Sequence, residues 1–164
     1  MTEELTKDIV RSKLKESISL GWIIEPEKSN NILIDKHLKN ASKSGKGGQG
    51  YPEFILTNTN YPDIVIVVEC KKDKKFHQSK NIDNFKNYAV DGVLHYSKYL
   101  SKEFDVISIA VSGSKENDLS VTNFLQTKKN KHEIISSELL NPSDLYELYL
   151  SKTSKADFEL NNFT

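Results

Sequence analysis

The sequence predicts a mixed α/β domain in which a central sheet is flanked by helices. Two observations carry this prediction. Patterns of helical period alternate along the chain with short apolar runs typical of strands. The stretch YPDIVIVVECKK (61–72) is apolar on both of its faces, as in a strand covered on both sides of a sheet. We expect residues 1–164 to form one domain, because a chain of 164 residues leaves little room for two cores.

The first half of the chain reads as a helix followed by a hairpin. EELTKDIVRSKLKESISLGW (3–22) has apolar residues at helical spacing and stops at Gly21. NILIDKHLKNAS (31–42) fits a helix or a strand. SKSGKGGQGYP (42–52) is a glycine-rich loop. EFILT (53–57) and IVIVVECK (64–71) then read as two strands joined by a turn at 58–63.

The second half continues the alternation. NIDNFKNYAVDGVLHYSKYL (81–100) predicts one long amphipathic helix. FDVISIAVSG (104–113) predicts a buried strand, and SVTNFLQ (120–126) another. NPSDLYELYLSK (141–152) begins a last helix, with Ser143 as the expected cap.

Composition excludes several classes of protein. The 23 Lys and Arg residues balance the 23 Asp and Glu residues, so net charge gives no sign of a nucleic-acid partner. The single cysteine excludes a disulfide framework, and no apolar run approaches the ~20 residues of a membrane span. The polar N-terminus is unlike a signal peptide, and no phosphate-binding loop motif is present. We therefore expect a cytoplasmic protein without an NTPase motor or a membrane partner.

The hairpin brings charged residues together at one of its ends. Glu69 and Lys71 are two residues apart, so they project from the same face of a strand. If residue 57 faces residue 65, Glu53 faces Glu69, with Cβ atoms ~4.5–5.5 Å apart. Asp63 would lie roughly 20 Å from Glu69 along a straight strand, too far to share an ion. We therefore expect Glu53, Glu69 and Lys71 to form one cluster.

This cluster suits magnesium-assisted hydrolysis. Mg²⁺ prefers oxygen ligands and commonly takes one or two carboxylates together with water and phosphate oxygens. The lysine can position or deprotonate the attacking water, or offset charge in the transition state. Glu53 and Glu69 are the candidate metal-binding carboxylates, and Cys70 between the two charged residues is the third candidate metal position; Mn²⁺ is a possible substitute. The simpler alternative is an ordinary surface salt bridge between Glu69 and a lysine.

The motifs GYPEFIL and PDIVIVVECKK together resemble the PD-(D/E)xK nuclease superfamily, with Glu69-Cys70-Lys71 as the E-x-K element. Over about the first 115 residues, the chain more narrowly resembles the N-terminal endonuclease domain of type I (R subunit) or fused single-chain restriction-modification enzymes. The resemblance implies a restriction-endonuclease-like core, magnesium-dependent cleavage of double-stranded DNA, and an N-terminal fragment of a longer enzyme. It also implies helicase or translocase modules, and methyltransferase or specificity modules, as partners.

The sequence departs from the family at the first acid. Relatives usually carry Asp after Pro in a G-x-P-D context before the hairpin, whereas this chain has Pro52-Glu53. The alternative Pro62-Asp63 matches the letters of the motif, but its distance from Glu69 argues against it. The departure leaves open a DNA-binding or docking domain that has the same fold without cleavage. A purely structural module in a larger complex is the third alternative.

The candidate DNA contacts come from two segments. Related domains often carry Gln-x-x-x-Tyr on the helix after E-x-K, and here Asn84 with Tyr88, and His95 with Tyr99, have that spacing. A helix would place these four residues on one stripe, although a polar flank beside the core is an equal alternative. The glycine loop, as Lys46, Gly47 and Gly48, and Lys74 after the second strand are the other candidates; the loop is equally well explained as a mobile connector. Some relatives carry an extra metal-shell glutamate on the first helix, and the resemblance makes Glu3, Glu4 and Glu16 the positions to consider, none of which is selected by periodicity.

Overall fold

The computed structural model describes residues 3–162, with side chains up to residue 153. Six strands form one sheet in chain order, β1-β2-β3-β4-β5-β6. Every neighbouring pair is antiparallel except β3 and β4, which are parallel. The expected α/β architecture with a mixed sheet is confirmed. The strands are β1 (Trp22–Pro26), β2 (Phe54–Asn58), β3 (Ile64–Lys71), β4 (Asp105–Lys115), β5 (Asp118–Gln126) and β6 (Glu133–Ser136).

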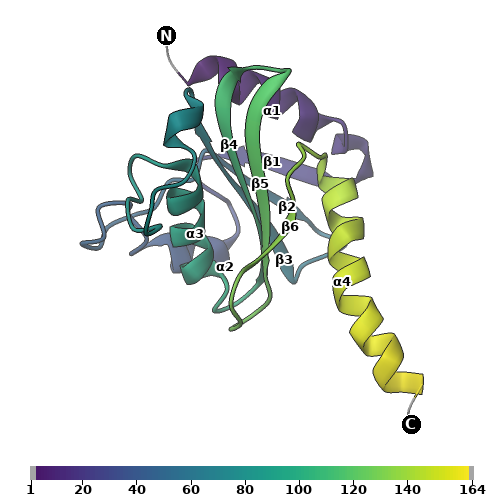
Figure 1. Ribbon diagram of the computed structural model, residues 1–164. Helices are drawn as coiled ribbons and strands as arrows, with labels where there is room; N and C mark the ends of the chain where they lie inside the picture. The colour runs from purple at the N-terminus through teal and green to yellow at the C-terminus, as the bar shows by residue number, and fades with distance from the viewer. Residues whose placement is uncertain (1–2, 163–164) are drawn as a thin grey trace.

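Helices cover both faces of this sheet (Figure 1). Helices α2 and α3 lie on one face, and α1 and α4 lie on the other. Over residues 3–162, none of the helices combines the length and apolar composition that a membrane crossing requires. The α-helices of this part are α1 (Glu4–Lys15), α2 (Ile32–Leu38), α3 (Ala89–Leu100) and α4 (Pro142–Asn162), with short 3₁₀ turns η1 (Ile18–Leu20) and η2 (Lys74–Phe76).

Strand β3 is the centre of the fold, and its two faces serve two cores. Val65 and Val67 pack with α2 and α3. Ile66, Val68 and Cys70 pack on the other face with α1 and α4. The α3 crossover links β3 to the parallel strand β4, as parallel pairing requires. The prediction that this strand is covered on both faces is confirmed.

Two strands were not predicted from the sequence. In the segment 3–22 the first helix ends at Lys15, and a 3₁₀ turn leads to Gly21, whose φ of 95° suits glycine. The chain then enters β1, a strand at one sheet edge with mixed burial, and β6 is the short strand at the other edge. The open choice at 31–42 resolves as helix α2, since the Asn31 side chain caps it through the N–H groups of residues 33 and 34.

The predicted helix 81–100 starts eight residues late, at Ala89. The carboxylate of Asp91 accepts backbone N–H groups from Ser79 and Asn84, which folds the preceding segment back on the helix start. Ile82 has a positive φ of 54°. The segment before α3 is therefore a pinned loop. The last helix is capped by the Asn141 side chain, which accepts the N–H of Asp144, and not by Ser143.

Candidate active site

The hairpin has the register that the sequence predicted. Phe54 pairs with Val68 and Leu56 with Ile66, which puts Glu53 opposite Glu69 one position further on. The backbone N–H of Glu53 donates to the carbonyl of Val68 at 3.1 Å and to Oε1 of Glu69 at 3.2 Å. Asp63 is exposed and precedes the other end of the strand. The two glutamates therefore meet, and Asp63 stays apart.

Glu69 is a fully buried carboxylate. Its side chain points toward α3, and its Oε2 accepts a hydrogen bond from Nζ of Lys43 at 2.9 Å. Gly92 makes this approach possible, since a Cβ there would lie 3.4 Å from Oε2 and 2.8 Å from the carbonyl of Phe85. Burial raises the pKa of Glu69, and the charge of Lys43 opposes that rise. The carboxylate is thus held in a costly environment by one ammonium group.

Glu53 has a different lysine as its partner. Its Oε2 lies 3.0 Å from Nζ of Lys7 on α1, and 16% of its side chain is exposed. Burial alone would lower the pKa of Lys7, but the hydrogen bond and charge of Glu53 outweigh it, so the pKa of Lys7 is raised. Each candidate metal-binding carboxylate is therefore paired with an ammonium group.

Lys71 is fixed at the end of β3. Its Nζ donates to the carbonyl of Lys86 at 2.9 Å and lies 3.7 Å from Oε1 of Glu3. Only 14% of the Lys71 side chain is exposed. Of the three acids considered on the first helix, Glu3 is the one beside Lys71, whereas Glu16 lies near Asn141 at the other end of α1. Glu53, Glu69 and Lys71 therefore lie around the end of β3, and each is paired with a different partner.

The donor set fits a hard cation in part. One or two carboxylates are the protein share of a typical Mg²⁺ site, the rest being water and phosphate. Among the described residues, no group of three or more His, Cys, Asp or Glu side chains is arranged to hold a metal ion. The Cys70 thiol is buried on the opposite face of β3, and burial raises its pKa well above the usual range. The thiol is therefore not a ligand beside Glu69, which leaves Cys70 only its backbone atoms for that role.

The glycine loop contributes a lysine to the site that the sequence did not identify as a site residue. Lys46, Gly47 and Gly48 are exposed, and the loop closes on itself where the N–H of Ser42 donates to the carbonyl of Gly48. Lys43, from the base of this loop, is the residue that reaches Glu69. Its basic, glycine-rich context marked the loop but did not separate Lys43 from its neighbours.

The predicted helical stripe of DNA contacts is wrong in its first half. Asn84 precedes α3, and Tyr88 is its N-cap residue, so neither lies on the helix. His95 is on α3 but is buried, donates from Nε2 to the carbonyl of Ser42, and stacks on Phe85 with ring centroids 4.2 Å apart. Its pKa is lowered, mainly by burial. His95 therefore anchors the glycine loop to α3.

The remaining candidates lie at the periphery. Tyr99 is half-buried, with Nζ of Lys102 5.2 Å from its ring centroid. Lys74 is exposed and pairs with Asp118 at 2.7 Å. Of these two residues, Lys74 presents a charge to solvent, and it is paired with an aspartate.

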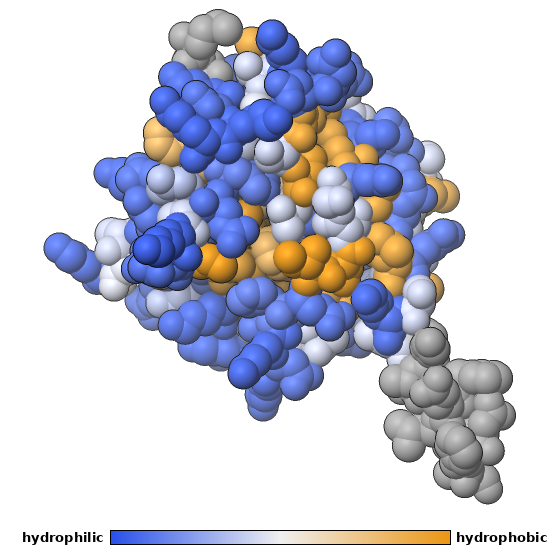
Figure 2. All heavy atoms as spheres, viewed as in Figure 1, coloured by the Kyte–Doolittle hydropathy of each residue, from blue (hydrophilic) through white to orange (hydrophobic). Residues whose placement is uncertain are grey.

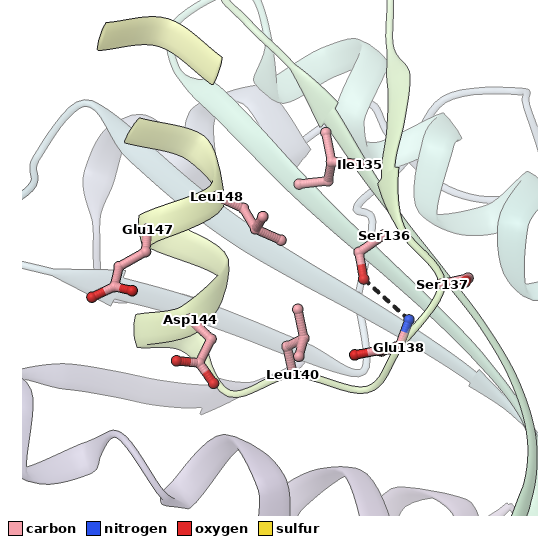
Figure 3. A pocket seen from close by; sticks show the side chains of 8 residues that line it. All are labelled: Ile135, Ser136, Ser137, Glu138, Leu140, Asp144, Glu147 and Leu148. Carbon is pink, nitrogen blue, oxygen red and sulfur yellow. Dashed lines mark hydrogen bonds between the residues drawn. The ribbon is translucent and has the colours of Figure 1, made fainter. Parts of the chain in front are cut away.

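Two surface depressions differ in charge. One lies between β6 and α4, where Figure 3 shows the carboxylates of Glu138, Asp144 and Glu147 around apolar side chains. In Figure 2 apolar surface is gathered between α1 and α4, within a polar surround. The depression with the carboxylates of Glu138, Asp144 and Glu147 would repel phosphate groups. The other, of about 310 Å³, adjoins the hairpin end and is lined by Ser42, Lys43, Ser44, Gln49, Tyr51, Lys86 and Tyr96.

Comparison of the chain with protein-family models, with curated proteins and with solved structures finds no match. The function of the site must therefore be inferred from its own residues.

Proposed function

We propose that this chain is a Mg²⁺-dependent endonuclease domain that hydrolyses DNA phosphodiester bonds in a restriction-modification system. The observation that carries the proposal is the hairpin register, which sets Glu53 opposite the buried Glu69 with Lys71 two residues further along the same strand. A buried carboxylate is costly unless it is paired or binds a cation. Its retention beside a second carboxylate supports a metal-dependent role.

The residues have separate tasks in this proposal. Glu53 and Glu69 would hold the cation from two adjacent strands, which fixes its position relative to β3. A bound Mg²⁺, or Mn²⁺ in its place, supplies a more acidic water and stabilises charge on the phosphate. Lys71 is held between the Lys86 carbonyl and Glu3, so its ammonium group is oriented before substrate arrives. It would position the attacking water and offset charge developing on the phosphate oxygens.

The surroundings of the site favour a phosphate-bearing substrate. The depression beside Glu69 is lined by Lys43 and Lys86 and by hydroxyl and amide side chains, without a carboxylate. Tyr51 at its rim is 54% exposed. Lysines and polar side chains of this kind contact the DNA backbone without reading sequence. Double-stranded DNA would therefore lie along the glycine loop, next to the two glutamates.

The wider assignment follows the sequence resemblance. In a restriction system of the cytoplasm, helicase or translocase modules and methyltransferase or specificity modules would select the DNA. This domain would then supply cleavage with little sequence preference of its own.

A second candidate function is a DNA-binding or docking domain with the same fold and no cleavage. The observation that favours it is the pairing of both carboxylates with lysines, Glu69 with Lys43 and Glu53 with Lys7. Ammonium groups in these positions satisfy the acids without any metal. Such a domain would bind DNA, but magnesium would change nothing.

Nicking of supercoiled plasmid in Mg²⁺ tests the proposal. The purified domain should convert the plasmid to open circles, and Glu69→Ala or Lys71→Ala should abolish this while circular dichroism shows an intact fold. Asp63→Ala, at the other end of β3, is the matched control and should nick at the wild-type rate. Normal cleavage by either active-site variant would reject the assignment. DNA binding by the wild-type protein without any nicking would favour the second candidate.

A further inference from the structure

The cation that holds Glu69 comes from a loop. Lys43 is the first lysine of the glycine loop, and its side chain is 23% exposed although the carboxylate it binds is only 1% exposed. Lys7, the partner of Glu53, is instead carried by α1, a helix packed on the sheet through Val10 and Leu14. Of the two ammonium groups, only that of Lys43 is attached to a segment without secondary structure.

The tip of the loop beyond Lys43 is open to solvent, although the base of the loop is closed where the N–H of Ser42 donates to the carbonyl of Gly48. Gly45, Gly47 and Gly48 have φ values of 72°, 86° and 94°, and no atom lies within 4 Å of where a Cβ would stand at Gly45 or Gly47. Lys46 at the tip is exposed and forms no ion pair within the described part of the chain. The Lys43 side chain also lines the depression beside the hairpin end, so it faces both Glu69 and the proposed path of the DNA.

We infer that Lys43 is a displaceable counter-ion of Glu69. When DNA binds, Lys43 moves from the carboxylate to a DNA phosphate, so binding of DNA and binding of a divalent cation favour each other. The inference rests on the proposed function, and it adds a regulatory role for a residue outside the E-x-K element. In the free protein, the ammonium group and a divalent cation compete for the same oxygen of Glu69. A phosphate gives Lys43 another partner of the same charge.

The coupling follows from linkage. If DNA removes the competing ammonium group, it raises the affinity for the cation, and the cation must raise the affinity for DNA by the same factor. Couplings of this kind are typically about tenfold. In the free protein, Lys43 supplies the positive charge that the buried carboxylate needs, and on DNA the cation takes over that role. The domain would then bind the cation chiefly when DNA is already bound.

Two binding measurements at one fixed pH test this inference, with Mn²⁺ as the probe. Mn²⁺ affinity without DNA is read from the electron paramagnetic resonance of the free ion. Affinity for a short fluorescent duplex is read by anisotropy with and without Mn²⁺. We expect Lys43→Met to bind Mn²⁺ about tenfold more tightly than wild type without DNA. We also expect Mn²⁺ to strengthen DNA binding about tenfold in wild type and not in the variant.

Two further variants make the comparison specific. Lys46→Met removes a charge from the same loop and should keep the wild-type Mn²⁺ affinity and coupling. Lys43→Gln, which carries no charge but still offers a donor, gives the same test if Lys43→Met does not fold. The inference would be overturned if the folded Lys43 variant had the wild-type Mn²⁺ affinity or kept the coupling. In that case, plasmid nicking by wild type would still support the proposed function. Absence of Mn²⁺ binding in both proteins would instead reject the proposed metal site itself.

Discussion

Each end of β3 has an acid, and the two acids have opposite environments. At the carboxyl end, Glu69 is fully buried, hydrogen-bonded to Lys43 and to the backbone of Glu53. At the amino end, Asp63 is exposed, and its backbone carbonyl accepts the N–H of Asp105 where β4 begins. The first environment is costly for a charge, whereas the second costs almost nothing. The difference teaches that the letters of a motif do not separate a buried, paired acid from an exposed one.

The same contrast holds for the lysines that accompany each end. Near Glu69, three ion pairs lie close together: Lys7 with Glu53, Lys43 with Glu69, and Lys71 with Glu3, each with an N–O distance of 3.7 Å or less. These pairs bridge α1, the glycine loop and the hairpin. Lys102, near the other end, is exposed and has a ring as its neighbour. A network of partly buried pairs fixes positions, whereas an isolated surface charge contributes little.

The largest expected difference between the two ends is in metal binding. Glu53→Ala should weaken Mn²⁺ binding about 100-fold, because it removes one of the two carboxylates proposed to hold the cation. Glu53→Asp should retain binding, since the shorter acid keeps the charge. Asp63→Ala should leave the affinity unchanged. Titration calorimetry of the three variants reads this directly, and the reverse pattern, with Asp63 essential, would mean that the acids at the carboxyl end hold no metal.

The sequence could predict which residues face each other at this end of the hairpin, because only the strand periodicity and the position of the turn determine it. A strand repeats its side chains every two residues, so a turn centred between 57 and 65 fixes which residues oppose one another. The expected register and the separation of Val65, Val67 and Glu69 from the Cys70 face were both correct.

Other features depended on contacts that local patterns do not contain. The edge strands β1 and β6 are short and partly exposed, so neither carries the apolar run that identified β3. The start of α3 depends on Asp91 binding Ser79 and Asn84. The pairing of Lys43 with Glu69 spans 26 residues and is set by the path of a glycine loop. No periodicity distinguishes one lysine of such a loop from the next.

A smaller difference should appear in the pH dependence of stability. Burial raises the folded-state pKa of Glu69 above the value near 4.3 of an unfolded chain. Its contribution is therefore fully present below about pH 4 and is lost as the pH rises through the folded pKa. The loss is about 1.4 kcal/mol for each unit by which the pKa is raised.

Replacing Glu69 by Gln should remove this component from the free energy of unfolding. The difference between wild type and Glu69→Gln should then fall steadily with rising pH, as measured by urea unfolding across the acid to neutral range. The exposed Asp63 provides the control, since Asp63→Asn should follow the wild-type curve. A difference that is flat with pH would show that Lys43 compensates the burial of Glu69 in full.

The smallest effects should come from single lysines near each end. Lys86 lines the depression at the carboxyl end, and Lys46 is exposed on the glycine loop. If each contacts a DNA phosphate, its replacement by Gln removes about one released counterion. The slope of the logarithm of DNA affinity against the logarithm of salt should then become shallower by about one for each variant, with no change in sequence preference. Lys102→Gln, near the amino end of β3, should leave the slope unchanged, because the proposed DNA path does not reach it. Anisotropy titrations over a range of salt concentrations measure these slopes. Equal slopes for all four proteins would make the carboxyl-end lysines ordinary solvated residues and would remove the glycine loop from the DNA interface, whatever the acids beneath it do.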